Sequence, residues 1–250
     1  MALYQWKMLW VTAAAKTAAT VALFVAGHTI CAQGLSVMPV NVFLSPGQKT
    51  ATVSVTNSGE KPTSIQIRAY DWSQTKDDDE LAASKLVVVS PPLITIAPAT
   101  TQVVRLILRQ SPAGNSEATY RLILDQIPGP NEPGVVQMVL RLSIPVFAAP
   151  AAKAAPRVQF HLERDGEKLF LVGVNSGQSH EAIRDISVTV SDGRKLNANS
   201  KASPYVLAGV TRRWELDAAG YTPQPGETLK LTAHGITGAI EEQVGVTAKP

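Results

Sequence analysis

The sequence is poor in the residue types from which most metal-binding, catalytic and nucleic-acid-binding sites are built. It has one cysteine and four histidines in 250 residues, and only 6% of its residues are aromatic. A single cysteine excludes a disulfide within the chain. The formal net charge is +3, and Lys7 and Lys16, which lie in the N-terminal segment described below, supply two of these charges. The rest of the chain carries about +1, which argues against a nucleic-acid partner.

Motifs for catalysis or cofactor binding are also missing. The sequence has no G-x-S-x-G, no H-E-x-x-H and no glycine-rich phosphate loop. His161, His180 and His234 stand far apart, without the nearby second ligand of a metal site. The acidic run at 76–80 lacks the glycine and distal glutamate of a calcium loop, which favours a solvated loop tip. We therefore expect no metal, no cofactor, no small-molecule substrate and no enzymatic activity.

Residues 1–32 have the features of a secretory signal peptide. Lys7 and Lys16 precede an apolar run at 17–27, and small residues follow up to a cleavage site near Ala32. The run is shorter than the roughly 20 apolar residues that cross a membrane, although an uncleaved anchor is the alternative. An export signal on a chain without disulfides indicates the bacterial periplasm.

The residues after this leader predict two all-β domains. Short strand-like segments alternate with turn sequences such as SPGQ, NSGEKP and PGPNEPG, which is typical of immunoglobulin-like β-sandwiches. Residues 150–156, rich in Ala and Pro, predict a short linker. We expect domains at 33–149 and 157–250, with Trp72 and Trp214 each filling one core.

Two sequence echoes support two similar sandwiches. VTNSG at 55–59 resembles GVNSG at 173–177, and APATTQV at 97–103 resembles AGVTRRW at 208–214. Both pairs are offset by about one hundred residues, the length of one immunoglobulin-like domain.

The most informative segment is VVQMVLRLSIPVF at 135–147. Every second residue is apolar, which predicts a long strand with an apolar stripe formed by Val136, Met138, Leu140, Leu142, Ile144 and Val146. Such a stripe must be buried, either in the protein's own sandwich or against another chain. For this segment alone, an ordinary sandwich strand is the simpler interpretation.

Together these features resemble the PapD-like periplasmic chaperones of pilus assembly. The segments that carry the resemblance are LSVMPVNVF at 35–43, SPPLITIAP at 90–98, QVVRL at 102–106, YRLILDQIP at 120–128 and the strand at 135–147. The first of these segments is expected to form a single opening strand. SIPVF at 143–147 and RRW at 212–214 are most similar to the lineage called archaic, or alternative. The resemblance implies a boomerang-like pair of sandwiches, with a pilus or fibre subunit and an outer-membrane usher as partners.

The resemblance also implies a mechanism of strand donation. Subunits of this family lack their last strand, and the chaperone lends its own to fill the exposed groove. In this chain the pocket-filling residues would be Val136, Met138, Leu140 and Leu142. An apolar stripe of this length also invites self-association when no subunit is bound.

The chain departs from the family where the subunit's terminal carboxylate is held. Val40 and Pro145 replace the usual arginine and lysine, so the resemblance implies a relocated anchor. Arg121 is the first candidate, because a guanidinium group can bind a carboxylate in a bidentate pair. The alternative is a surface arginine paired to Asp125. Arg105 is the second candidate, with a cross-strand structural role as its alternative.

A different class of function remains open. An exported two-domain immunoglobulin-like adhesion or carbohydrate-binding module would present loops and not a donated strand. A lectin should have clustered aromatic residues or a calcium site, and the sequence displays neither. An uncharacterised enzyme is a third alternative.

Overall fold

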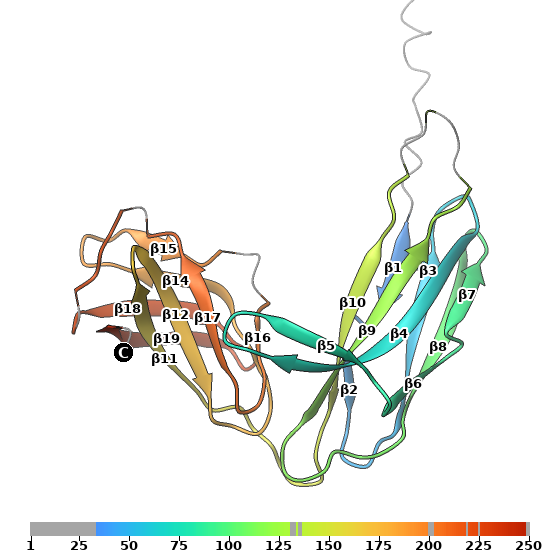
Figure 1. The fold of residues 1–250 in the computed structure, drawn as a ribbon, viewed down its shortest axis with the longest axis horizontal. Helices are drawn as coiled ribbons and strands as arrows, with labels where there is room; N and C mark the ends of the chain where they lie inside the picture. The colour runs from blue at the N-terminus through green and yellow to red at the C-terminus, as the bar shows by residue number, and fades with distance from the viewer. Residues whose placement is uncertain are drawn as a thin grey trace, which may run out of the picture.

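A computed structural model describes residues 34–130, 134, 137–199, 203–218, 220–224 and 226–248, and all regular structure in them is β-strand. The predicted signal peptide lies outside these residues, and none of them forms a helix able to span a membrane. Figure 1 shows two lobes, one built from β1–β10 and one from β11–β19, which diverge like the arms of a boomerang. The predicted all-β class with two immunoglobulin-like sandwiches is confirmed.

Two sheets enclose the core of the first domain. Its strands are β1 (Leu35–Met38), β2 (Val42–Leu44), β3 (Thr50–Asn57), β4 (Thr63–Gln74), β5 (Asp79–Ala83), β6 (Val87–Ser90), β7 (Leu93–Ile96), β8 (Thr100–Leu108), β9 (Ala118–Ile127) and β10 (Arg141–Ala148). One sheet has the order β1-β3-β8-β6 and the other β2-β10-β9-β4-β5, with β7 paired to β4. Alternate residues such as Val53 and Val55 of β3 point into the core, as the period of a strand requires.

The second domain has its own core. Its strands are β11 (Val158–Asp165), β12 (Lys168–Asn175), β13 (Glu181–Ala182), β14 (Arg184–Thr189), β15 (Lys195–Asn197), β16 (Tyr205–Val206), β17 (Thr211–Leu216), β18 (Thr228–His234) and β19 (Ala239–Ala248). The main sheet has the order β15-β14-β18-β19-β11-β12-β17, and Trp214 fills its core as predicted. Because β10 ends at Ala148 and β11 begins at Val158, the segment between them contains no strand. The boundaries of the linker stay a prediction.

The two sequence echoes mark equivalent places in the two domains. Asn57 and Asn175 are both buried, and each carboxamide oxygen accepts a hydrogen bond from the glycine two residues later. The Asn57 amide donates to the carbonyl of Ile96, and the Asn175 amide to that of Leu207. Each carbonyl directly precedes the second echo of its domain, so one buried asparagine joins both echoes in each sandwich.

Three local expectations were wrong. The opening strand is divided, because β1 pairs with β3 in one sheet and β2 runs parallel to β10 in the other. The strand expected from residue 135 begins at Arg141, since the Leu140 amide donates to the side chain of Gln126 and interrupts the ladder. Trp72 does not fill the first core. It packs with Phe147 and with Tyr205 of the second domain in a cluster between the domains.

Candidate functional site: an open strand edge beside an interdomain cleft

β10 has an uncovered edge along part of its length. β9 pairs with it from Arg141 to Ala148, whereas β2 covers its other side only from Val146 to Ala148. The backbone amide of Ala149 donates towards β2, and the Leu140 carbonyl accepts from β9. Successive residues of a strand direct their backbone groups to opposite sides. Residues 141, 143 and 145 therefore direct theirs to the side of β2, and at 141 and 143 no described strand covers that side.

The polar groups on this edge follow from the sequence. Arg141 and Ser143 each offer an N–H and a C=O. Pro145 has no N–H, and its C=O lies where the parallel pairing with β2 begins. A proline is tolerated in a strand where its nitrogen has no partner strand to bond, which fits its position here. Two donors and two acceptors are thus available to an added strand.

The apolar stripe passes from the core to solvent along the same segment. Ile144 and Val146 are buried in the core, with Ile144 only 4% exposed, and Leu142 packs against the core from its margin. Leu140 is partly exposed, and Met138 is 76% exposed. Val136, the first predicted donor residue, lies outside the described residues. The upper part of the stripe, Met138 and Leu140, is therefore accessible to a partner, whereas the lower part, Ile144 and Val146, is not.

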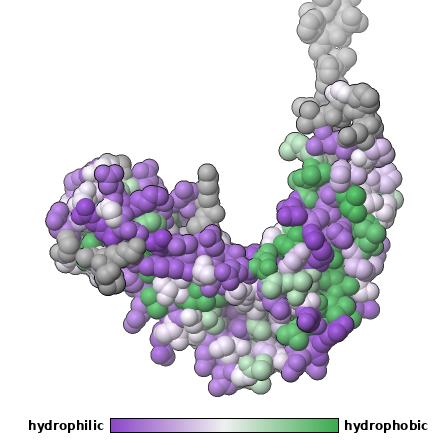
Figure 2. All heavy atoms as spheres, viewed as in Figure 1, coloured by the Kyte–Doolittle hydropathy of each residue, from purple (hydrophilic) through white to green (hydrophobic). Residues whose placement is uncertain are grey.

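Exposed apolar surface is concentrated in the first domain. Among the described residues, Ile236 is the one large apolar side chain of the second domain that is strongly exposed, and all the others belong to the first. Figure 2 shows this contrast, with green surface along the arm of the first domain and mostly purple surface on the second. The apolar surface available to a partner thus lies on the domain that carries β10.

Arg121 lies on the outer face of β9, turned away from the core that its neighbours Tyr120 and Leu122 enter. Its cross-strand partner on β10 is Pro145, one of the two positions that lack the family's basic residue. The guanidinium carbon lies 3.7 Å from the centre of the Trp72 ring, and Nη2 is 3.3 Å from Oδ2 of Asp79. Burial lowers the pKa of Arg121, and the Asp79 carboxylate opposes that shift.

Arg121 lines a cleft of about 670 Å³ between the domains. From the first domain, Ser143 and Asp79 also line it, and from the second domain Tyr205 and Arg212 do so. The uncovered edge of β10 and a buried cation thus share one site, since Ser143 belongs to both.

The other sequence candidates lie elsewhere. Arg105 is exposed on β8 in the opposite sheet, across from Thr52 and Ser90, so the structure does not bring it together with Arg121. The pairing of Arg121 with Asp125 is not formed, because Asp125 binds Arg68 and Arg141 instead. Burial alone would raise the pKa of Asp125, but the hydrogen bonds from those arginines outweigh it and lower that pKa.

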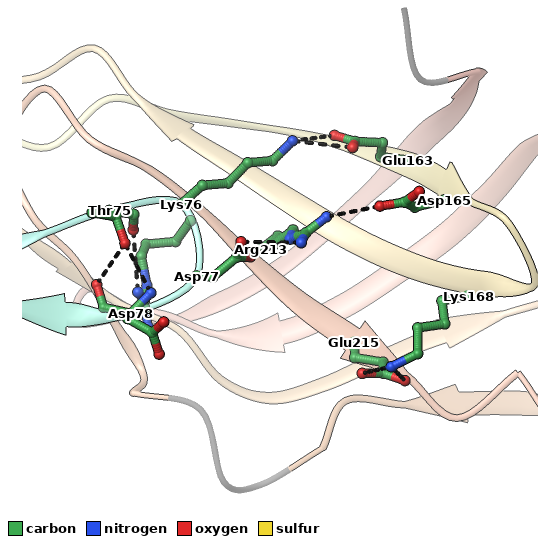
Figure 3. Close-up of polar contacts among 10 residues, drawn as sticks. Thr75, Lys76, Asp77, Asp78, Glu163, Asp165, Lys168, Arg213 and Glu215 are labelled. Atoms are coloured by element: carbon green, nitrogen blue, oxygen red, sulfur yellow. Dashed lines mark hydrogen bonds and ion pairs between the residues drawn. The ribbon is translucent and has the colours of Figure 1, made fainter.

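The acidic run predicted as a solvated loop tip is a contact between the domains (Figure 3). Lys76 Nζ lies 2.7 Å from a carboxylate oxygen of Glu163, and Asp77 accepts hydrogen bonds from two guanidinium nitrogens of Arg213. Arg213 also pairs with Asp165. The hairpin of β4 and β5 thus crosses to the second domain and joins the two arms.

Several site residues escaped the sequence analysis. Asp79 lies more than a hundred residues before Tyr205 and Arg212, and no local pattern connects it to them. Arg212 lies within the second echo, a segment noted for that echo and for its similarity to the family but not as part of a site. Alternation along β17 places Arg212 on the same buried face as Trp214.

The geometry defines a class of protein: two immunoglobulin-like sandwiches with a partly open edge strand beside a polar cleft between them. The sequence model of one family, described as pili and flagellar-assembly chaperone, PapD N-terminal domain, matches residues 34–154. The chain belongs to the PapD-like family of pilus-assembly chaperones. No curated protein sequence matches it significantly.

Solved structures share the two-domain fold. One is a chain of the CsuC–CsuE chaperone–tip adhesion subunit complex of Acinetobacter baumannii, with TM-score 0.63 and 20% identity over 87% of this chain and 100% of that one. Another is the CupB2 chaperone of Pseudomonas aeruginosa, with TM-score 0.57 and 14% identity over 84% and 100%. A chain of the Salmonella enterica complex of SafA pilin with the SafB chaperone has TM-score 0.58 and 16% identity over 85% and 95%.

Proposed function

We propose that the protein is a periplasmic chaperone of the archaic lineage that captures pilus or fibre subunits through β10 and delivers them to an outer-membrane usher. The observation that carries the proposal is the uncovered edge of β10 at 141–143, continuous with the accessible apolar side chains of Met138 and Leu140. An open edge pairs readily with an added strand, and alternate side chains then fill pockets in the partner. The similar folds of CsuC and SafB, which were solved with subunits, support a subunit as the partner.

The available contacts supply both apolar burial and backbone hydrogen bonds for capture. Met138, Leu140 and Leu142, preceded by Val136, would enter a subunit groove. Each large apolar side chain contributes about 1.5–3 kcal/mol when it leaves water. Ordering of residues 137–140 and the cost of association subtract from that sum. The backbone groups of Arg141 and Ser143 then fix the direction and register of the added strand.

We also propose that Arg121 holds the terminal carboxylate of the subunit. It lies directly across from Pro145, so the positive charge would sit one strand away from its usual place in the family. Its side chain is 11% exposed at the cleft, where a carboxylate would be largely shielded from solvent. Arg121→Ala should weaken capture; because it also removes the contact with Trp72 and the pair with Asp79, capture is compared at a temperature where the variant remains folded. Capture that equals the wild type in a pull-down would exclude Arg121 as the anchor.

Co-expression tests the proposal as a whole. The full chain, tagged and carrying its leader, is expressed with the fibre-subunit genes adjacent to its own and purified from the periplasm. A one-to-one complex with the wild type, lost in Leu140→Glu, is the expected result. No complex with either protein would contradict strand donation and favour the adhesion or carbohydrate-binding module, which a glycan-binding screen would then examine.

A further inference from the structure

Two buried guanidinium groups, one from each domain, share a single carboxylate in the cleft. The side chains of Arg121 on β9 and Arg212 on β17 are 11% and 2% exposed. Asp79, the first residue of β5, lies between them, with Oδ2 3.3 Å from Nη2 of Arg121 and Oδ1 3.7 Å from Nη2 of Arg212. Two positive charges and one negative charge leave this point of the cleft with an excess of positive charge.

Arg212 is short of hydrogen-bond acceptors. Nη1 donates to the carbonyl of Thr75 at 3.2 Å, but the 3.7 Å contact with Asp79 is too long for a hydrogen bond. Nε has no hydrogen-bond partner among the described residues. A guanidinium group has five N–H donors, and unpaired donors on a buried charge are costly. Arg212 therefore retains the capacity to bind a further anion.

Most of the nearby charged groups are paired elsewhere. Arg213 binds Asp77 and Asp165, and Glu215 binds Lys168 on the surface of the second domain (Figure 3). Asp78 also lines the cleft and contacts Thr75 through its main chain, and in the part of the chain that the structure describes its carboxylate forms no ion pair with Arg121 or Arg212. Among the described residues, Asp79 is the carboxylate that pairs with both cleft arginines.

Asp79 is held in place by a neutral partner as well. Nε2 of Gln74 donates to Oδ1 of Asp79 at 2.8 Å, and it also donates to the carbonyl of Tyr205. The Asp79 side chain remains 26% exposed, and the other residues of β5 are exposed on the surface. A partly exposed carboxylate on an edge strand can leave the two arginines without disturbing either core.

We propose that Asp79 occupies the carboxylate-binding position in the free protein, and that Arg121 and Arg212 together form that position. The inference rests on the proposed function, because it assigns the second arginine and the resting occupant of the same anchor. Two carboxylates in one site repel each other, so the carboxylate of a bound subunit must replace Asp79.

Such an occupant makes the anchor selective. Asp79 is tethered to the site, so its effective concentration there exceeds that of a free carboxylate in solution. A chain end that is also paired with the edge of β10 is tethered in the same sense and can compete. The cleft would therefore reject free carboxylates in solution and accept those delivered by a segment bound along the open edge at Arg141 and Ser143.

Peptide binding to the full chain, purified from the periplasm, tests this directly. The probe is a fluorescein-labelled hexapeptide of alternating threonine and valine, made with a free C-terminal carboxylate or with a C-terminal amide. Affinities are measured by fluorescence anisotropy. Asp79→Asn keeps the size of the side chain and the acceptor for Gln74, and Asp77→Asn, next to Arg213, removes the same charge from the same hairpin as a matched control.

Asp79→Asn should strengthen binding of the carboxylate peptide about tenfold, the scale of one charge-assisted contact, and leave the amide peptide unchanged. Asp77→Asn should change the ratio of the affinities for the carboxylate peptide and the amide peptide by less than about twofold, as expected for a surface pair. Arg212→Gln should bring the ratio close to one. Arg212→Lys, which keeps the charge, should restore part of the preference and serves if the glutamine variant is unstable.

An unchanged ratio in Asp79→Asn, or weaker binding of the carboxylate peptide, would overturn the inference. Weaker binding would mean that Asp79 positions Arg121 and does not occupy its binding position. The result is separable from strand donation, because the peptides report on the anchor and the pull-down reports on subunit capture. If the wild type captures a subunit but Asp79→Asn leaves the ratio of the two peptide affinities unchanged, only the role of Asp79 is rejected. If Asp79→Asn raises that ratio but the wild type captures no subunit, only strand donation is rejected.

Discussion

Glutamate introduced at Leu140 and at Ile144 should have different consequences, although both residues belong to one stripe. Leu140 is partly exposed beyond the end of the β9 ladder, whereas Ile144 is 4% exposed in the core. Leu140→Glu should cost the free protein about 1 kcal/mol or less, as for most surface substitutions. Ile144→Glu should reduce the free energy of unfolding far more, since an unpaired carboxylate would enter the core.

The magnitudes separate the two outcomes clearly. Truncation of a buried isoleucine costs about 2–5 kcal/mol, and a buried unpaired carboxylate adds several more, against a total stability of about 5–15 kcal/mol. For Leu140→Glu, the free energy that is lost is that of subunit binding and not that of folding. About 1.5–3 kcal/mol of apolar burial is lost and the charge must be desolvated, so a total near 4 kcal/mol weakens capture about a thousandfold.

Urea unfolding of both variants, together with the pull-down, measures these effects. We expect Leu140→Glu to unfold at nearly the wild-type urea concentration and to recover no subunit. Ile144→Glu should unfold at a much lower concentration or fail to accumulate. If Leu140→Glu were as unstable as Ile144→Glu, the whole stripe would belong to the protein's own core, and strand donation would be refuted.

Three further predictions concern the framework of the site. Phe147→Ala removes a ring that stacks on His180 across the domains, and it should cost about 3–5 kcal/mol and split one calorimetric transition into two. Asn175→Ala leaves buried carbonyls without their donor, so it should destabilise the second domain by about 2 kcal/mol, measured by its unfolding midpoint. Asp125 has a lowered pKa in the folded state, so its contribution is present above the unfolded pKa and is lost as the pH falls through the folded value. Acidification below about pH 4 should therefore lower the urea midpoint of the wild type more than that of Asp125→Asn. An equal change in urea midpoint between about pH 6 and about pH 3 in the two proteins would contradict this.

The alternation of apolar residues predicted much of the fold, because register is strongly fixed wherever one face of a strand is buried. Tyr120, Leu122 and Leu124 enter the core as their spacing requires, and so do Ile144 and Val146. The Asn-Ser-Gly echoes also predicted the kinship of the two domains, since a buried asparagine followed by a turn carries a specific pattern of hydrogen bonds.

Contacts between the domains were beyond the reach of sequence patterns. Trp72 and Phe147 lie on faces of their strands that would be solvated in an isolated sandwich, and the second domain covers them. The acidic hairpin resembled a loop because its partners Glu163 and Arg213 lie far along the chain. Local periodicity predicts which face of a strand is buried but carries no information about pairing with distant charges.

Amide hydrogen exchange at Ser143 tests the central claim most directly. In the free protein its N–H faces the uncovered edge of β10, whereas the N–H of Ile144 is directed towards β9 and serves as an internal control. In the purified complex with a co-expressed fibre subunit, we expect exchange at Ser143 to slow to the rate of Ile144. If Ser143 exchanged as fast in the complex as in the free protein, no strand would be added at this edge, and the account of strand donation would be contradicted.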